Sequence, residues 1–188
     1  MQQGFDFQTA ESAFDAVNAV RALEEAVKNC GFEQSLIVLV KMRASQINGC
    51  AWRIHSHIRN ARFHGQTEER LRVLHAWRDP AMPFSARERA ALAWTEALTV
   101  LSTTHVTDAI HQQAREQFDR DELAKLTLLV GTTNLWDRLS IGFRSVLHAA
   151  GEACSDGRST GCTCSATIVP VDVRYAQRRR KQPASSRT

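Results

Sequence analysis

The chain has 188 residues, of which 43% are hydrophobic and 23% charged, a composition typical of a globular protein that can bury the core of one domain. No apolar run approaches the roughly 20 residues that span a bilayer, and the opening MQQGFDFQTAESAF carries acidic residues where a secretory signal would be apolar. We therefore expect a cytoplasmic protein with no membrane partner, whose five cysteines are thiols rather than structural disulfides.

The formal net charge of +4 belongs to the C-terminal end of the chain. Residues 1–150 contain 17 Lys or Arg and 17 Asp or Glu, whereas residues 151–188 contain seven basic and three acidic residues. The end of the chain is also rich in Gly, Ser and Thr and has no helical apolar stripe. We therefore predict a helical domain over residues 1–146 and a flexible, disordered basic tail over residues 147–188.

Two features of this tail are candidate binding sites. The basic run Arg178–Lys181 would attract nucleic acid only weakly, through charge alone. Cys162 and Cys164, with Cys154 nearby, could supply thiolate ligands to a soft metal ion, but no Cys-x-x-Cys pair accompanies them. We therefore expect neither a metal nor another cofactor.

Hydrophobic periodicity predicts helices in the first half of the domain. Apolar residues at three- and four-residue steps predict an amphipathic helix over residues 8–30, ended by Gly31. The apolar run Leu36–Val40 is predicted as part of a buried helix rather than a strand, because its segment is long and polar at both ends. Asn48-Gly49 interrupts that helix, and a new one is expected to run to about Phe63.

Capping signals predict the remaining helices. Thr67 is the expected N-cap of the helix EERLRVLHAW, and SARE at residues 85–88 forms a capping box before RAALAWTEALTVL. Helices are also predicted over 108–118 and, capped by Asp119 with Glu122, over 120–144. No hairpin pattern occurs, so the predicted fold is all-α, a compact bundle of about six or seven helices.

The stretch NGCAWRIHSH, residues 48–57, contains the candidate catalytic residues. Cys50 lies in the first turn of the predicted helix, where free backbone N–H groups and the helix dipole favour the thiolate, and Arg53 adds a positive charge. His57 shares the same face but lies about 10 Å along the axis from Cys50, so it would serve position 53 rather than the thiol directly. Trp52 is a candidate lining residue of a substrate cleft.

Less specific interpretations of these residues remain open. Cys50 can also be interpreted as a small buried hydrophobe, and His57 as an ordinary helix histidine. His55 and His57 do not form a metal pair, because their i, i+2 spacing directs them to different sides of a helix and no carboxylate completes the set.

Residues 10–145, and above all ASQINGCA, LHAWR and ERAALAWTEALT, resemble the alkyl hydroperoxidase D-like, or carboxymuconolactone decarboxylase, family of small all-α proteins. The resemblance implies a homo-oligomer, a trimer or a multiple of trimers. It also implies an antioxidant activity of the peroxiredoxin type, in which a hydroperoxide is reduced at a cysteine and a dithiol donor resets the enzyme.

The motif of the redox members is only partly present. They carry a Glu, a Cys-x-x-Cys and a His at positions that correspond here to Val38, Cys50, Arg53 and His57. In those members the second cysteine attacks, the first resolves the product as a disulfide, and the Glu and His relay protons. Cys50 and His57 can thus be carried over as catalytic residues and Arg53 only as a lining residue, which implies weak or absent peroxide reduction.

Two other functions remain open. In the decarboxylase branch, His57 would act as a general base on a lactone acid and Arg53 would pair with the substrate carboxylate. Alternatively, the protein is a non-catalytic helical oligomer whose basic tail binds an acidic partner.

Overall fold

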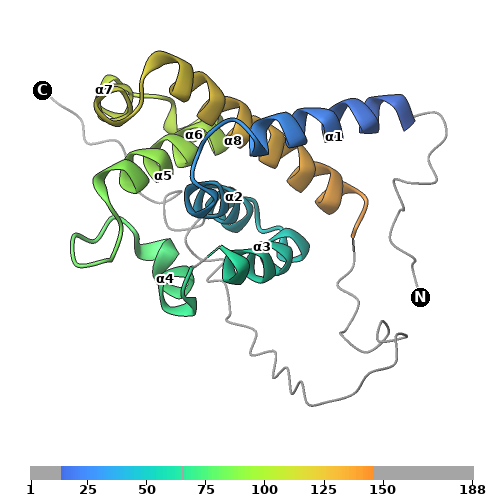
Figure 1. The fold of residues 1–188 in the computed structure, drawn as a ribbon, viewed down its shortest axis with the longest axis horizontal. Helices are drawn as coiled ribbons and strands as arrows, with labels where there is room; N and C mark the ends of the chain where they lie inside the picture. The colour runs from blue at the N-terminus through green and yellow to red at the C-terminus, as the bar shows by residue number, and fades with distance from the viewer. Residues whose placement is uncertain (1–13, 65, 146–188) are drawn as a thin grey trace, which may run out of the picture. The chain divides into compact units, whose positions relative to one another are not determined.

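The computed structural model describes residues 14–64 and 66–145, and every regular element in these ranges is helical (Figure 1). The α-helices are α1 (Phe14–Lys28), α2 (Gln34–Asn48), α3 (Ala51–Phe63), α4 (Glu68–Val73), α5 (Ala86–Thr99), α6 (Leu101–Thr104), α7 (Asp108–Gln117) and α8 (Arg120–Gly142), with a 3₁₀ turn at Leu74–Ala76. The predicted all-α bundle is confirmed. The predictions for the tail lie outside the described residues.

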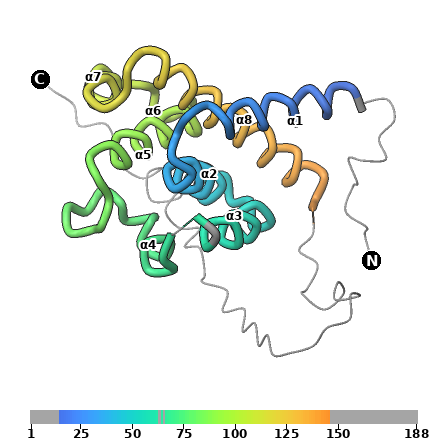
Figure 2. Tube along the Cα trace, viewed as in Figure 1, coloured from blue at the N-terminus to red at the C-terminus, as the bar shows by residue number. Residues whose placement is uncertain are grey.

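Helix α2 occupies the centre of the bundle, and Figure 2 shows α1, α3, α5 and α8 around it. It contacts α3, α5 and α8, and its residues Leu36–Ser45 are buried without interruption. Because every side of this segment is covered, its apolar run carries no helical periodicity. The prediction of a buried helix rather than a strand is confirmed.

Local signals end and begin the helices as expected. Gly49 adopts the left-handed conformation, with φ of 70°, and closes α2. Thr67 accepts a hydrogen bond from the Arg70 N–H, and both Ser85 and Asp119 form complete capping boxes. Two details differ: the helix after Thr67 tightens into the 3₁₀ turn, and the short α6 was not predicted.

Two apolar clusters form the core of the described residues. One joins α1, α2, α5, α7 and α8, and the other joins α2, α3, α4 and α5. Since α2 and α5 contribute to both, they hold the two halves together. Among the described helices, none is long and apolar enough to cross a membrane.

Candidate functional site

Cys50 is the N-cap residue of α3 and follows directly from the left-handed turn at Gly49. Its backbone N–H donates to the carbonyl of Ser45 over 3.0 Å, which ties the start of α3 to the end of α2. The residue is 2% exposed. Its surroundings are nevertheless polar, because the Asp137 carboxylate and Arg53 both act on the pKa of the thiol.

Asp137 comes from α8 and is completely buried. Its Oδ1 accepts from Ser45 Oγ over 2.8 Å, and its Oδ2 accepts from Asn48 Nδ2 over 2.8 Å. Asn48 Nδ2 also donates to Asn134 Oδ1 over 2.7 Å. Asp137 was not predicted from the sequence, although an acid on the buried face of a helix, in line with Val130 and Thr133, is a signal that could have found it.

The expected thiolate is not what the structure supports. Burial raises the pKa of the Cys50 thiol, and the neighbouring Asp137 carboxylate raises it further. Arg53 lowers this pKa, but its effect does not outweigh the other two. Burial likewise raises the pKa of Asp137, against hydrogen bonds from Asn48 and Ser45. The resting site is therefore a buried thiol beside a buried carboxyl group.

Arg53 lies one turn into α3 and is only 9% exposed. Its Nη2 is 3.9 Å from Glu24 Oε1, and the guanidinium carbon lies 5.9 Å from the centre of the Trp52 ring. Among the described residues, none accepts a hydrogen bond from the guanidinium, and Nε is buried without a partner. Glu24 Oε1 accepts a hydrogen bond over 3.0 Å from Lys41 Nζ, so one carboxylate of α1 serves two buried cations.

His57 is 6% exposed, and its Nε2 is buried without a hydrogen-bond partner. Burial and the positive charges of Arg53 and Lys41 lower its pKa to about 3, so the imidazole is neutral near pH 7. Arg53 acts electrostatically on both Cys50 and His57. The guanidinium thus acts on residues at both ends of the predicted motif.

The remaining residues of the motif differ in how deeply they are buried. Val38 is buried in the apolar core, so the position of the relay acid in redox relatives carries no charge here. Trp52 is 37% exposed and His55 is exposed. Within residues 14–64 and 66–145, no group of three or more His, Cys, Asp or Glu residues could hold a metal ion.

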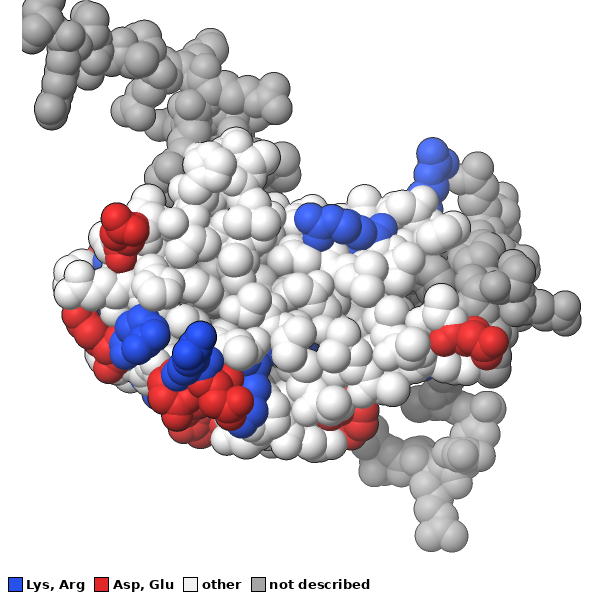
Figure 3. All heavy atoms as spheres, turned by 90° about the horizontal axis from the view of Figure 1, so that it is seen from above, with Lys and Arg blue, Asp and Glu red and all other residues white. Residues whose placement is uncertain are grey.

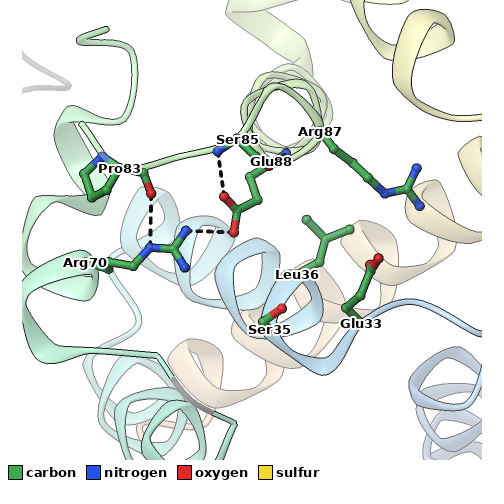
Figure 4. Close-up of a pocket in the computed structure, with 8 residues that line it drawn as sticks. All are labelled: Glu33, Ser35, Leu36, Arg70, Pro83, Ser85, Arg87 and Glu88. Carbon is green, nitrogen blue, oxygen red and sulfur yellow. Dashed lines mark hydrogen bonds and ion pairs between the residues drawn. The ribbon is translucent and has the colours of Figure 1, made fainter. Parts of the chain in front are cut away.

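A cavity of 460 Å³ lies elsewhere, between the N-terminal ends of α2 and α5 and helix α4 (Figure 4). Arg70 crosses it, with Nη2 2.7 Å from Glu88 Oε1 and Nε donating to the Pro83 carbonyl over 3.2 Å. Arg87, at its other side, pairs with Glu122 of α8. These ion pairs join helices, and none of the motif residues lines the cavity.

Comparison with known proteins identifies the relatives of the chain. Residues 14–97 match the model of the carboxymuconolactone decarboxylase family. The uncharacterized protein YdfG of Bacillus subtilis is 34% identical over 131 residues, which cover 70% of this chain and 88% of that protein.

A crystal structure from Agrobacterium tumefaciens also matches. It is of a protein of unknown function, described as a candidate antioxidant defence protein AhpD, with 33% identity and a TM-score of 0.73. The match covers 79% of this chain and 99% of that one. The extent of these matches, together with the all-α bundle, shows that the chain belongs to the carboxymuconolactone decarboxylase family.

Proposed function

We propose that the protein is an alkyl hydroperoxidase D-like antioxidant enzyme that reduces hydroperoxides slowly at one cysteine, Cys50. The observation that carries the proposal is the position of its sulfur at the start of α3, among polar groups and within the field of the Arg53 guanidinium. A cysteine that only fills space in the core would have apolar neighbours. The description of the Agrobacterium protein points in the same direction.

The proposed step balances without a second cysteine. The Cys50 sulfur attacks one peroxide oxygen, the O–O bond breaks, and the thiol proton ends on the leaving oxygen, giving an alcohol and a sulfenic acid. Two thiol groups of a dithiol donor then return the sulfenic acid to the thiol, releasing water and a disulfide. Because the thiol pKa is raised, the fraction of thiolate near pH 7 is small, and turnover is expected to be slow.

Peroxide consumption with a dithiol donor tests this function. We expect slow turnover by the unmodified protein, loss of turnover in Cys50→Ala, and a sulfenic acid at Cys50 that a dimedone-type reagent traps. Cys30→Ala is the matched control, because Cys30 is the other free thiol among the described residues and lies outside the site. Turnover that persists in Cys50→Ala would refute the proposal.

A second function is favoured by a different observation. His57 is neutral and its Nε2 is buried without a hydrogen-bond partner. The neighbouring Arg53 guanidinium also has an unused donor, because its Nε has no partner. Such a pair could remove a proton from a lactone acid whose carboxylate Arg53 binds. In that case a lactone acid would bind to the Cys50→Ala protein as well as to the unmodified one, and His57→Gln would abolish turnover but not folding.

We also propose that the chain forms a homo-oligomer, a trimer or a multiple of trimers. Several large apolar residues of α8 are exposed: Leu128, Leu135 and Ile141. Figure 3, a view from above, shows a face on which most residues are uncharged. Analytical ultracentrifugation tests the assembly, and Leu128→Glu with Leu135→Glu should dissociate it if α8 forms the interface.

A further inference from the structure

We propose that Asp137 is a catalytic residue of this site, which accepts the proton of the Cys50 thiol as the sulfur attacks and passes it to the leaving oxygen. The inference rests on the proposed cysteine chemistry, but it concerns a residue of α8 that belongs to no part of the motif. It assigns a specific acceptor to the proton of the reacting thiol.

The contacts of Asp137 single out one exchangeable proton. A buried carboxyl group needs a partner for each oxygen, and here Ser45 Oγ and Asn48 Nδ2 each donate to one of them. The Cys50 thiol is a third neighbour, close enough to act on the pKa of Asp137. No cation lies within ion-pair distance of Asp137 among the described residues. The amide and the hydroxyl do not ionise near neutral pH, so among these three neighbours only the thiol can give up its proton.

The turn between α2 and α3 holds this arrangement rigid. The carbonyl of Ser45 accepts the backbone N–H of Cys50, while its hydroxyl donates to Asp137. Asn48 donates to Asp137 and to Asn134, which lies one turn before Asp137 on α8. The same short turn therefore positions the thiol and two donors that fix the carboxylate.

Transfer of the proton from the Cys50 thiol to Asp137 avoids placing two buried negative charges side by side. Release of the thiol proton to solvent would leave two buried negative charges side by side, which is why the carboxylate opposes the thiolate. If the proton moves from sulfur to Asp137, the pair keeps a single negative charge. The Arg53 guanidinium acts on both groups and can stabilise that charge on either one.

Asp137→Asn separates this role from a purely structural one. The substitution removes a negative charge beside the sulfur, so the pKa of the Cys50 thiol should fall. If Asp137 only opposed the thiolate, the rate of oxidation at Cys50 would then rise. If Asp137 is the proton acceptor, the rate should fall about 100-fold in spite of the lower thiol pKa.

The experiment follows Cys50 alone, by peptide mass spectrometry in single-turnover reactions from pH 5 to 9. Each protein is treated with hydrogen peroxide and, separately, with the neutral electrophile methyl methanethiosulfonate. Asp121→Asn is the matched control, because it makes the same change at an exposed position of α8, next to Lys125. Circular dichroism verifies that each variant is folded, and Asp137→Glu keeps a carboxylate if the asparagine variant does not fold.

We expect the unmodified protein to react with both reagents over the whole range, with a shallow dependence on pH. The rate of Asp137→Asn should be lower and should rise about tenfold per pH unit up to the thiol pKa. An unchanged or faster rate in Asp137→Asn would overturn the inference. If methyl methanethiosulfonate gives the expected result but peroxide does not react at all, the role of Asp137 stands and the proposed peroxide reduction fails.

Discussion

Glu24 Oε1 of α1 lies 3.9 Å from Arg53 Nη2 of α3, and of these two residues only Arg53 belongs to the sequence motif. Lys41 of α2 shares the same carboxylate oxygen at 3.0 Å. In redox relatives the position of Arg53 holds the attacking thiol. Here it holds a buried cation whose charge is balanced by an acid from a distant helix, and this exchange explains why the site is not a dithiol centre.

Restoring the missing sulfur should restore a dithiol cycle. In Arg53→Cys, the second thiol lies one helical turn from Cys50, and the removal of the guanidinium leaves room for it. We expect peroxide turnover with a dithiol donor to rise at least tenfold, together with a peroxide-induced disulfide between Cys50 and the introduced cysteine in the mass spectrum. Arg53→Ser is the control, and a variant that forms the disulfide without faster turnover would contradict the expectation.

The carboxylate of Glu24 should contribute to stability in a pH-dependent way. Burial raises its pKa, but Lys41, Lys28 and Arg53 together hold the pKa below the ordinary 4.5. The stabilisation is therefore complete above about pH 4.5 and is lost as the pH falls through the lower, folded-state pKa. Glu24→Gln leaves two buried cations without a carboxylate and should lower the free energy of unfolding by about 2–4 kcal/mol at pH 7.

Urea unfolding at pH 7 and pH 3.5 checks this prediction. Glu25→Gln is the matched control, since Glu25 is the next residue along the chain and its side chain is mostly exposed. The difference between the unmodified protein and Glu24→Gln should shrink at the lower pH. Equal effects of the two substitutions would show that Glu24 is not the counterion of the buried cations.

His57 should make the fold sensitive to mild acid. Its pKa is about 3 in the folded protein and about 6.5 when the chain is unfolded, so between these values the unfolded state binds the extra proton. Stability should fall as the pH drops from 6.5 towards 3, by up to about 1.4 kcal/mol per pH unit from this group. His57→Gln should reduce that slope, whereas the same change at the exposed His55 should not. Urea titrations at pH 7.5, 5.5 and 4.5 measure the slope.

Glu96 should be a major stabilising residue away from the site. Its Oε1 accepts from Arg43 Nη2 over 2.6 Å and from the Trp77 indole over 2.7 Å, and its Oε2 pairs with Arg78. Glu96→Gln leaves the buried Arg43 without a counterion. We expect a loss of about 3 kcal/mol in the free energy of unfolding, with the Cys50 oxidation rate unchanged. A thermal melt with an unchanged midpoint would contradict this.

Features that depend on near neighbours in the chain could be predicted from the sequence. The end of α2 at Asn48-Gly49, the start of α3 at Cys50 and the capping boxes of α5 and α8 all rest on contacts within about four residues. The family resemblance likewise rests on a continuous stretch of motif. These signals were sufficient for the longer helices, the all-α class and the place of Cys50 at the start of its helix, but not for the short α6.

The ionisation of the site depends instead on residues that the chain brings together from far apart. The helix terminus and Arg53 favour the thiolate, yet burial and Asp137 of α8 raise the pKa of Cys50. In the same way, Glu24 of α1 becomes the counterion of Arg53 only when the helices pack. Desolvation and charge pairing act through space over a few ångströms. The ionisation of the site is therefore determined by residues that are distant in the sequence and meet only in the fold, and the motif alone could not predict it.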